Sequence, residues 1–516
     1  MKRSALFALT LLVFLFFTVS CNDICPQGKA KNDVGTCVPS SAFSDRPKGD
    51  KPGVKGGQVP PATEPAIYDY SWEAERFSWG QRSLVSRQND PFMADGIKLF
   101  IAGKFEEARD KFNKSAENNK REPEPLIYKN NSMVRAKGKE SFRIAAVVPI
   151  SDNEDNATEI LRGIAQAQEE FNNLGGANGR LLEVIIADDG LINATREQKN
   201  AVVGNVAKQL VDDPSILGVV GHNSSEASKT AIETYEPANL AIVSPTSTST
   251  SLKSEVFFRI PPSDKVSAQK LACYVKRKLN NKKAKVVVFF DSGSNYSVSF
   301  KKEFRVYFPK ENAEEENADK DMISQDFDAS KEIYENVYKN KVDFAMLIPS
   351  TDSYPLAIDL ARLNKGLGDD SISLLGGDSL YGKAKLESGA ESLNGLIIPV
   401  AWFADSVSSE GFYQKGLRQW GWGRINWRTA MSYDATVAFI SSFQSGAESR
   451  QDIVQNLSNV SLSSDKTSGE DLRFNPDRER LLEPVLIKIE SDKGLSSEAE
   501  PKYVLTNENI EIGDCF

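Results

Sequence analysis

Two stretches of the chain place hydroxyl side chains directly after a short apolar run. Residues 216–228 read ILGVVGHNSSEAS, and residues 241–251 read AIVSPTSTSTS. The first stretch contains His222, the single histidine among 516 residues. A histidine beside serines could act as general base for a hydroxyl nucleophile. Hydroxyl groups at strand ends could instead hold a small anion.

The residues around His222 do not favour catalysis. Ser224 and Ser225 lack the G-x-S-x-G turn that presents a nucleophilic serine in many hydrolases. One histidine cannot supply a cluster of zinc ligands, and the five cysteines include no CxxC pair. The glycines of LGGANGR follow a helical pattern rather than a strand, unlike a dinucleotide fingerprint. We therefore predict a structural, hydrogen-bonded His222 in a protein that is not an enzyme, with no cofactor and no metal.

The hydroxyl-rich segments fit a binding site for a small anion. In open parallel α/β sheets, ligands bind beyond the carboxyl ends of the strands. Ser224 and Ser225 also begin a predicted helix, whose first N–H groups are unpaired and carry partial positive charge. One such segment would indicate helix capping. Two segments on nearby strands favour a site that holds a carboxylate without a lysine.

A repeating pattern of strands and helices positions both segments. Apolar runs typical of strands buried on both faces occur at residues 142–150, 181–188, 216–221, 241–245, 256–260, 285–291, 342–349, 371–378 and 395–402. Helical patterns separate most of these runs, which predicts parallel sheets with right-handed crossovers. There are too many strands for one small sheet. The predicted fold class is therefore α/β, with two doubly wound parallel-sheet lobes joined by a hinge and preceded by a short helical hairpin.

The start of the chain has the pattern of a secretory signal, which we assign to residues 1–20. Two basic residues precede the apolar run 5–19, which is shorter than the about 20 residues of a membrane span. The pair Ser20-Cys21 resembles a bacterial lipoprotein processing site, at which Cys21 would be acylated. We expect an exported protein in the periplasm or on the outer face of a bacterial membrane, anchored through Cys21. An ordinary signal peptide or an uncleaved anchor is the alternative.

The rest of the chain divides into a linker, a helical segment and the main domain. Residues 21–90 contain the lipid attachment site and a linker too rich in proline and glycine to form a core. Residues 91–140 have the spacing of one tetratricopeptide unit, which fits either a hairpin packed on the main domain or a protein-docking module. Residues 141–516 form the lobes: lobe 1 at about 141–262 and 396–465, lobe 2 at about 263–395 and 466–516.

Composition limits the possible partners. The net charge of −9 argues against nucleic acid, because phosphate binding needs a positive surface. In an oxidising compartment Cys25 and Cys37 could close a small loop, and Cys273 and Cys515 could pair across the fold. Geometry rather than sequence decides between free and paired cysteines.

The segment GHNSSEASKTAIETYEPANLAIVSPTSTSTS resembles the leucine/isoleucine/valine-binding proteins, the branched-chain amino-acid receptors of ABC transporters. The family pattern is G-H-x-x-S, a helix ending in Y-E, and then I-S-P-x-x-T. Gly221, Tyr235 and Ser244-Pro245 match its spacing without a gap. The resemblance continues more weakly from about Phe142 to the C-terminal region and does not cover residues 22–140. It implies a type I periplasmic-binding fold.

The resemblance also implies roles for five side chains. Ser225, Thr246 and Thr248 would bind the α-carboxylate of the ligand. Tyr296 would close over the ligand from the second lobe, and Asp378 would pair with the α-ammonium. A zwitterion needs hydrogen-bond donors at one end and an acceptor-only carboxylate at the other.

The function that this resemblance implies is that of an extracytoplasmic substrate-binding protein. It would bind an amino acid or a similar small zwitterion between its lobes and deliver it to an ABC transporter permease. Asp152, Asn153 and Asp155, and Ser350 and Thr351, depart from the family and leave room for a polar or larger ligand. The alternative is a regulatory lipoprotein with the same fold, such as an activator of penicillin-binding proteins, which also joins tetratricopeptide-like helices to two lobes.

Overall fold

The computed structural model describes residues 29–31, 37–39, 75–85, 90–280, 283–308, 319–406, 410–421, 425–490, 502–506 and 510–515. The chain divides into two units, Met1–Tyr68 and Asp69–Phe516. The described part of the first unit is an antiparallel pair of strands, β1 (Lys29–Lys31) and β2 (Cys37–Pro39). The predicted signal segment, the lipid attachment site Cys21 and the Cys25 thiol lie outside the described residues.

Lobe 1 is built on a six-stranded sheet with the order β3-β5-β4-β6-β7-β8. Its strands are β3 (Phe77–Ser78), β4 (Phe142–Val148), β5 (Leu182–Asp188), β6 (Gly218–Val220), β7 (Ala241–Ser244) and β8 (Phe257–Arg259). Strands β4 to β8 are parallel, and β3 pairs antiparallel with β5 at the edge. Every residue of β5 is buried, as expected for a strand covered by helices on both faces.

Lobe 2 contains a seven-stranded sheet with the order β10-β9-β11-β12-β13-β16-β17. Its strands are β9 (Val286–Phe290), β10 (Asp319–Asp321), β11 (Phe344–Ile348), β12 (Ser373–Gly376), β13 (Ile397–Val400), β16 (Val485–Glu490) and β17 (Lys502–Leu505). The first five strands of the sheet order are parallel, whereas β16 pairs antiparallel with both β13 and β17. The predicted α/β class with two parallel-dominated sheets is confirmed.

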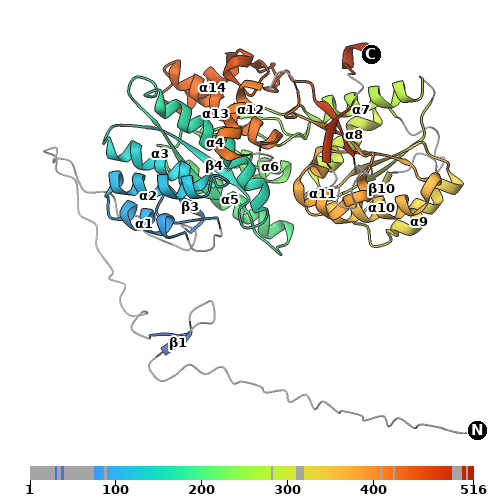
Figure 1. The fold of residues 1–516 in the computed structure, drawn as a ribbon, viewed down its shortest axis with the longest axis horizontal. Coiled ribbons are helices and arrows are strands. Elements are labelled where there is room, and N and C mark those ends of the chain that lie inside the picture. The colour runs from blue at the N-terminus through green and yellow to red at the C-terminus, as the bar shows by residue number, and fades with distance from the viewer. Residues whose placement is uncertain are drawn as a thin grey trace, which may run out of the picture. The chain divides into compact units, whose positions relative to one another are not determined.

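Helices cover the sheets of both lobes, which lie side by side in Figure 1. Lobe 1 carries α4 (Glu154–Asn173), α5 (Arg196–Asp212), α6 (Ser225–Tyr235), α12 (Glu410–Trp420), α13 (Trp427–Gln444) and α14 (Arg450–Ser458). Lobe 2 carries α7 (Asp264–Lys278), α8 (Asn295–Arg305), α9 (Ala329–Tyr334), α10 (Tyr354–Gly366) and α11 (Lys383–Gly389). None of the helices in the described part of the chain has the length and apolar character of a membrane span.

Helices α4 and α13 pack closely because α4 has a glycine at the contact. A Cβ atom at Gly163 would lie 2.1 Å from the carbonyl oxygen of Thr429 and 2.2 Å from Oγ of Ser432. The same contact is held by hydrogen bonds from Ser432 Oγ to the carbonyl of Ile160 (2.8 Å) and from Thr429 Oγ1 to that of Glu159 (3.0 Å). This packing fixes the start of α13, which reaches the cleft.

The helical segment before lobe 1 packs on that lobe. It comprises α1 (Pro91–Ile101), α2 (Phe105–Asn118) and α3 (Glu124–Ala136). The buried Asn131 of α3 donates from Nδ2 to the carbonyl oxygens of Val184 (2.7 Å) and Trp79 (2.9 Å), and it accepts from the Val184 N–H (3.0 Å). Asn131 thus bonds to the backbone of β5. These contacts agree with the alternative of helices packed on the main domain.

The described chain crosses between the two sheets at three places. The first crossing, between β8 and α7, lies near the predicted boundary at 262. Strand β13 pairs with β12 and β16, so the second crossing follows Val400 rather than position 396. Residues up to Arg480 still contact lobe 1, because the backbone N–H of Arg480 donates to the carbonyl of Arg259 in β8 (2.9 Å). The third crossing therefore follows Arg480 rather than position 466.

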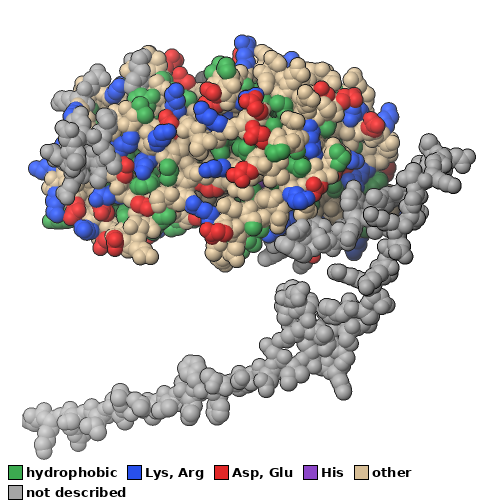
Figure 2. Space-filling view, turned by 180° about the vertical axis from the view of Figure 1, so that it is seen from behind, with side chains coloured by type: hydrophobic (Ala, Val, Ile, Leu, Met, Phe, Trp, Pro, Cys, Tyr) green, Lys and Arg blue, Asp and Glu red, His purple; other side chains and the backbone are tan. Residues whose placement is uncertain are grey.

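Charged side chains are mixed on the face of the molecule shown in Figure 2. Lysine and arginine alternate there with aspartate and glutamate, and no extended area of one sign is seen among the described side chains of that face.

A disulfide joins Cys273 of α7 to Cys515, with 5.6 Å between the two Cα atoms. It ties the described C-terminal residues to lobe 2. Cross-linking residues this far apart in sequence restricts the unfolded chain, so we expect Cys273→Ser with Cys515→Ser to lower stability by about 2–4 kcal/mol. Denaturant unfolding of the variant and of the oxidised wild type measures this difference. A reducing agent should destabilise the wild type alone; an unchanged wild type would contradict the prediction.

Candidate functional site

The carboxyl ends of strands from both lobes border one cleft, whose inner part is a cavity of about 60 Å³. The residues that line this inner cavity come from lobe 1 (Asn156, Asn223, Ser224, Ser225, Glu226, Thr246, Thr248, Trp427 and Arg428) and from lobe 2 (Ser294, Tyr296, Ser350, Thr351, Asp378 and Ser379). The five side chains singled out in the sequence as ligand contacts, Ser225, Thr246, Thr248, Tyr296 and Asp378, are all among them.

The inner cavity adjoins an outer pocket of about 710 Å³. Both spaces are bordered by Asn223, Ser224, Glu226, Ser294, Ser350 and Thr351. Asp152, Asn153 and Asp155, at which the sequence departs from the family it resembles, line the outer pocket. Ser350 and Thr351, the other departure, line both spaces. The two spaces form a continuous site with an inner end and an outer end.

The first hydroxyl-rich segment places a helix start at the inner cavity. Ser224 caps α6 by accepting a hydrogen bond from the Ala227 N–H (3.1 Å). Ser225, the first residue of α6, is buried, and its hydroxyl has no hydrogen-bond partner among the described residues. Thr246 Oγ1 donates to the carbonyl of Asn223 (2.8 Å), so Thr246 also holds this segment in place. The arrangement offers a free hydroxyl beside the positive end of a helix.

The second hydroxyl-rich segment is fixed by Arg259 of β8, which is 1% exposed. Its guanidinium donates to the carbonyl oxygens of Thr248 and Ser249, the latter at 2.8 Å. The Ser263–Asp264 turn is joined to the same segment, because the Asp264 N–H bonds to the Thr248 carbonyl at 2.9 Å. The backbone of this segment therefore faces the guanidinium, and the Thr246 and Thr248 side chains line the cavity.

The lobe 2 side of the inner cavity carries an acidic group and a phenol. Asp378 follows β12, and Tyr296 lies in the first turn of α8. The Tyr296 hydroxyl is buried without a hydrogen-bond partner. Tyr296 fits over the strand end because residue 377 is glycine, where a Cβ atom would lie 2.0 Å from the phenol oxygen. Burial raises the pKa of the Asp378 carboxyl, against the adjoining Tyr296 hydroxyl and the positive charge of Arg428.

A second acid, Asp264, lies close behind this wall. It is fully buried at the start of α7; the Ser299 and Thr248 hydroxyls lie near its carboxylate, but neither oxygen has a hydrogen bond of ordinary geometry among the described residues. Burial raises the pKa of the Asp264 carboxyl to about 7, opposed by the hydroxyls of Ser299 and Thr248 and increased further by Asp378. The burial of Asp264 beside the site could not be predicted from the sequence, because an acid in the first turn of a helix is common.

His222 takes no part in lining the cleft. It is fully buried, with Nδ1 2.6 Å from Asp189 Oδ2 and Nε2 3.1 Å from the Tyr235 hydroxyl. Both ring nitrogens are thus occupied, and the predicted hydrogen-bonded histidine is confirmed. Among the described residues, no group of three or more histidine, cysteine, aspartate or glutamate side chains could hold a metal ion.

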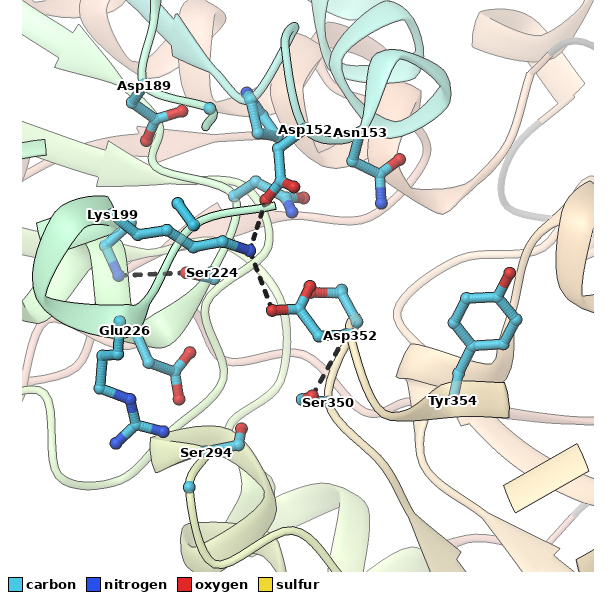
Figure 3. Close-up of a pocket in the computed structure, with 18 of the residues that line it drawn as sticks. Asp152, Asn153, Asp189, Lys199, Ser224, Glu226, Ser294, Ser350, Asp352 and Tyr354 are labelled. Carbon is cyan, nitrogen blue, oxygen red and sulfur yellow. Dashed lines mark hydrogen bonds and ion pairs between the residues drawn. The ribbon is translucent and has the colours of Figure 1, made fainter. Parts of the chain in front are cut away.

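One ion-pair cluster joins the lobes across the outer pocket (Figure 3). Lys199 Nζ lies 2.9 Å from Asp152 Oδ2 of lobe 1 and 2.9 Å from Asp352 Oδ2 of lobe 2. At the inner end, the Asn295 N–H of lobe 2 donates to the Glu226 carboxylate of lobe 1. The lobes therefore touch on both sides of the site.

Comparison with known proteins identifies a family and solved structures that are similar to this chain. The family model described as periplasmic binding protein matches residues 141–485. The structure of the branched-chain amino acid transporter substrate-binding protein LivJ from Streptococcus pneumoniae, in complex with isoleucine, has a TM-score of 0.58 at 20% identity and covers 71% of this chain and 100% of that one. The structure of the leucine-binding protein LivK from Thermotoga maritima has a TM-score of 0.58 at 19% identity, and the match covers 70% of this chain and 97% of that one. These structures share the type I periplasmic-binding fold.

Two sequence relatives match over shorter segments. An amino acid binding protein of Pseudomonas aeruginosa is 39% identical over 87 residues, which are 17% of this chain and 21% of the relative. A leucine-, isoleucine-, valine-, threonine- and alanine-binding protein of the same organism is 30% identical over 116 residues, 22% of this chain and 29% of the relative. The match thus spans under a third of either relative.

The Asp264 carboxyl should make stability depend on pH. Its pKa is about 7 in the fold against 3.8 for the free side chain, so the folded state binds this proton more tightly. Stability should therefore fall as the pH rises from about 4 through about 7, by on the order of 4 kcal/mol. We expect Asp264→Asn to remove this part of the dependence and to be the more stable protein at pH 8.5 without ligand.

Urea unfolding of the wild type and of Asp264→Asn at pH 5.5, 7 and 8.5 measures this effect. Asp326→Asn, at an exposed position, is the matched control and should follow the wild type. An Asp264→Asn variant that is less stable than the wild type at pH 8.5 would show that the charged carboxylate is stabilised in the fold.

Proposed function

Because this chain belongs to the periplasmic binding protein family, we propose that it is an extracytoplasmic substrate-binding protein for an amino acid or a similar small zwitterion. One observation carries the proposal. The inner cavity has hydroxyl groups and a helix start on the lobe 1 side, and an acid with an unpaired phenol on the lobe 2 side. This distribution suits a molecule with a carboxylate at one end and an ammonium group close to it.

The ligand carboxylate would be bound by lobe 1. Ser225 offers its hydroxyl, and the N–H groups at the start of α6 carry partial positive charge. Thr248 adds a hydroxyl donor from the second segment, whereas the Thr246 O–H, which donates to the Asn223 carbonyl, would have to exchange that bond to reach the carboxylate. Charge-assisted hydrogen bonds of this kind are each worth about 1.5–3 kcal/mol.

The ammonium group would be bound between Asp378 and Tyr296, with Asp264 behind them. Two buried carboxyls near each other repel when both are ionised, and the charge of Asp378 raises the pKa of the Asp264 carboxyl. A cation at this place would remove that repulsion and stabilise both ionised forms. The Tyr296 oxygen, which has no hydrogen-bond partner, could accept from the same group.

The family and the likeness to transporter receptors support delivery of the ligand to an ABC transporter permease. The secretory pattern of residues 1–20 supports export, with a lipid anchor at Cys21 that would keep the protein at a membrane. The competing regulatory lipoprotein would require no small ligand. The unpaired polar groups of the inner cavity favour the receptor, because such groups are costly to bury unless a ligand completes their hydrogen bonds.

The test of ligand binding is native mass spectrometry of gently purified protein, followed by calorimetry with the twenty amino acids. We expect one class of amino acid to bind. Ser225→Ala with Thr248→Ala should weaken it by about 100-fold or more, since two hydrogen bonds to a carboxylate are lost. Thr230→Ala on the same helix, which does not line the cavity, is the matched control. A folded double variant with unchanged affinity would overturn the carboxylate assignment.

The ammonium assignment has its own test. Asp378→Asn should weaken binding of the amino acid by about tenfold or more, because it removes the charge that pairs with the ammonium. The matching α-hydroxy acid, which lacks that ammonium group, should bind the wild type and the variant equally. Equal losses for both compounds, measured by calorimetry, would mean that Asp378 shapes the cavity instead of pairing with the ligand.

A further inference from the structure

One cation of the cleft has no anion in contact with it. Lys385 of α11 lines the outer pocket and is 5% exposed. Its Nζ lies 5.0 Å from the centre of the Tyr354 ring, and it forms no ion pair or hydrogen bond with the described residues. Burial lowers the pKa of Lys385 to about 8, and the positive charge of Arg428 acts in the same direction. Tyr354 belongs to lobe 2 and borders the same pocket (Figure 3).

Most carboxylates of the outer pocket are already matched by local groups. Asp152 and Asp352 share Lys199, and Asp189 contacts His222. Asp291 accepts from the Gly293 N–H (2.8 Å) and the Ser353 hydroxyl (2.7 Å), and Glu226 accepts from the Asn295 N–H. Glu154 and Asp155 are exposed in the first turn of α4, where the helix dipole favours acids. The number of acids therefore does not by itself make the site select a cation.

The wall of the inner cavity contains buried donors. Arg428 is 3% exposed and pairs with Glu159 at 3.1 Å; its charge acts on the pKa of both Asp378 and Lys385. Asn156 Nδ2 and Trp427 Nε1 are buried without hydrogen-bond partners. Buried donors of this kind cost stability until an acceptor reaches them. An aliphatic side chain at this place would leave the Asn156 and Trp427 N–H groups unpaired.

We propose that the site selects an amino acid whose side chain ends in a carboxylate, held by Lys385, Arg428, Asn156 and Trp427. This inference rests on the proposed function and specifies its ligand. The α-carboxylate and α-ammonium groups occupy the inner cavity, and the side chain extends toward Lys385 at the border of the outer pocket. The distal carboxylate supplies the anion that Lys385 lacks and the acceptor that the two unpaired N–H groups need.

The experiment is calorimetry with L-glutamate, L-aspartate, L-glutamine, L-leucine and L-arginine. We expect one of the two dicarboxylic amino acids to bind at least about tenfold more tightly than glutamine, as one charge-assisted contact would give. Lys385→Met should remove that preference, because it should weaken the dicarboxylic amino acid by about tenfold more than it weakens glutamine. Lys383→Met, on the same helix with its side chain 83% exposed, is the matched control and should keep the preference.

The outcomes separate this inference from the proposed function. Tighter binding of leucine or arginine would overturn the inference and leave the receptor function standing. A Lys385→Met variant that weakens all ligands equally would also overturn the inference. If Asp155→Asn weakened all ligands in the same way, the lysine would pair with Asp155 instead of with the ligand. Failure of every amino acid to bind would overturn the proposed function and the inference together.

Discussion

The buried guanidinium of Arg259 connects three parts of the molecule on which the site depends. It belongs to the last strand of the lobe 1 sheet, and it donates to the carbonyls of the second hydroxyl-rich segment. Its backbone bonds to Arg478 and Arg480, just before the third crossing between the lobes. Arg480 in turn forms a fully buried ion pair with Asp434 of α13 at 2.6 Å. Removing a buried charge from such a network leaves its partners unsatisfied. The hydroxyl groups of the second segment are therefore held in position by contacts that lie outside the cavity.

The polar groups of this protein differ in whether their hydrogen bonds are complete. Outside the site, hydrogen bonds join His222 to Asp189 and Tyr235, and Asn131 to the β5 backbone, although other buried atoms there, such as Gln168 Oε1 and Trp420 Nε1, have no partner. Around the cavity several atoms are unpaired, including both oxygens of Asp264 and the Tyr296 hydroxyl. Unpaired buried groups reduce the stability of the empty protein, and a ligand that satisfies them gains that energy on binding. The unpaired atoms of Tyr296, Asn156 and Trp427, which line the inner cavity, therefore indicate the polar groups that a ligand would have to supply.

The sequence predicted the strands well because runs such as 285–291 and 342–349 are continuously apolar and buried on both faces. The five site residues lie at strand ends or in the first turn of a helix, where position along the chain determines which edge of the sheet they reach. Lys385, Arg428 and Asn156 could not be found in this way. They too lie in the first turns of helices, α11, α13 and α4, but no strand end before them indicates that these helices begin at the cleft. Their position depends on helix packing, such as Gly163 of α4 against Thr429 of α13. Asp264 was missed because an acid in the first turn of a helix usually has only a local role.

The energy that holds the two lobes together on a ligand has to come largely from the ligand itself. The ion pair between Lys199 and Asp352 joins the lobes, but the Asp352 side chain is 67% exposed, and pairs of this kind contribute about 0–1 kcal/mol. The groups proposed for the carboxylate lie in lobe 1, whereas Asp378, Tyr296 and Lys385 lie in lobe 2. A ligand with only a carboxylate could bind to lobe 1 without drawing lobe 2 toward it. A ligand that carries all the matching charges connects the lobes, so the same contacts that determine specificity would also determine closure.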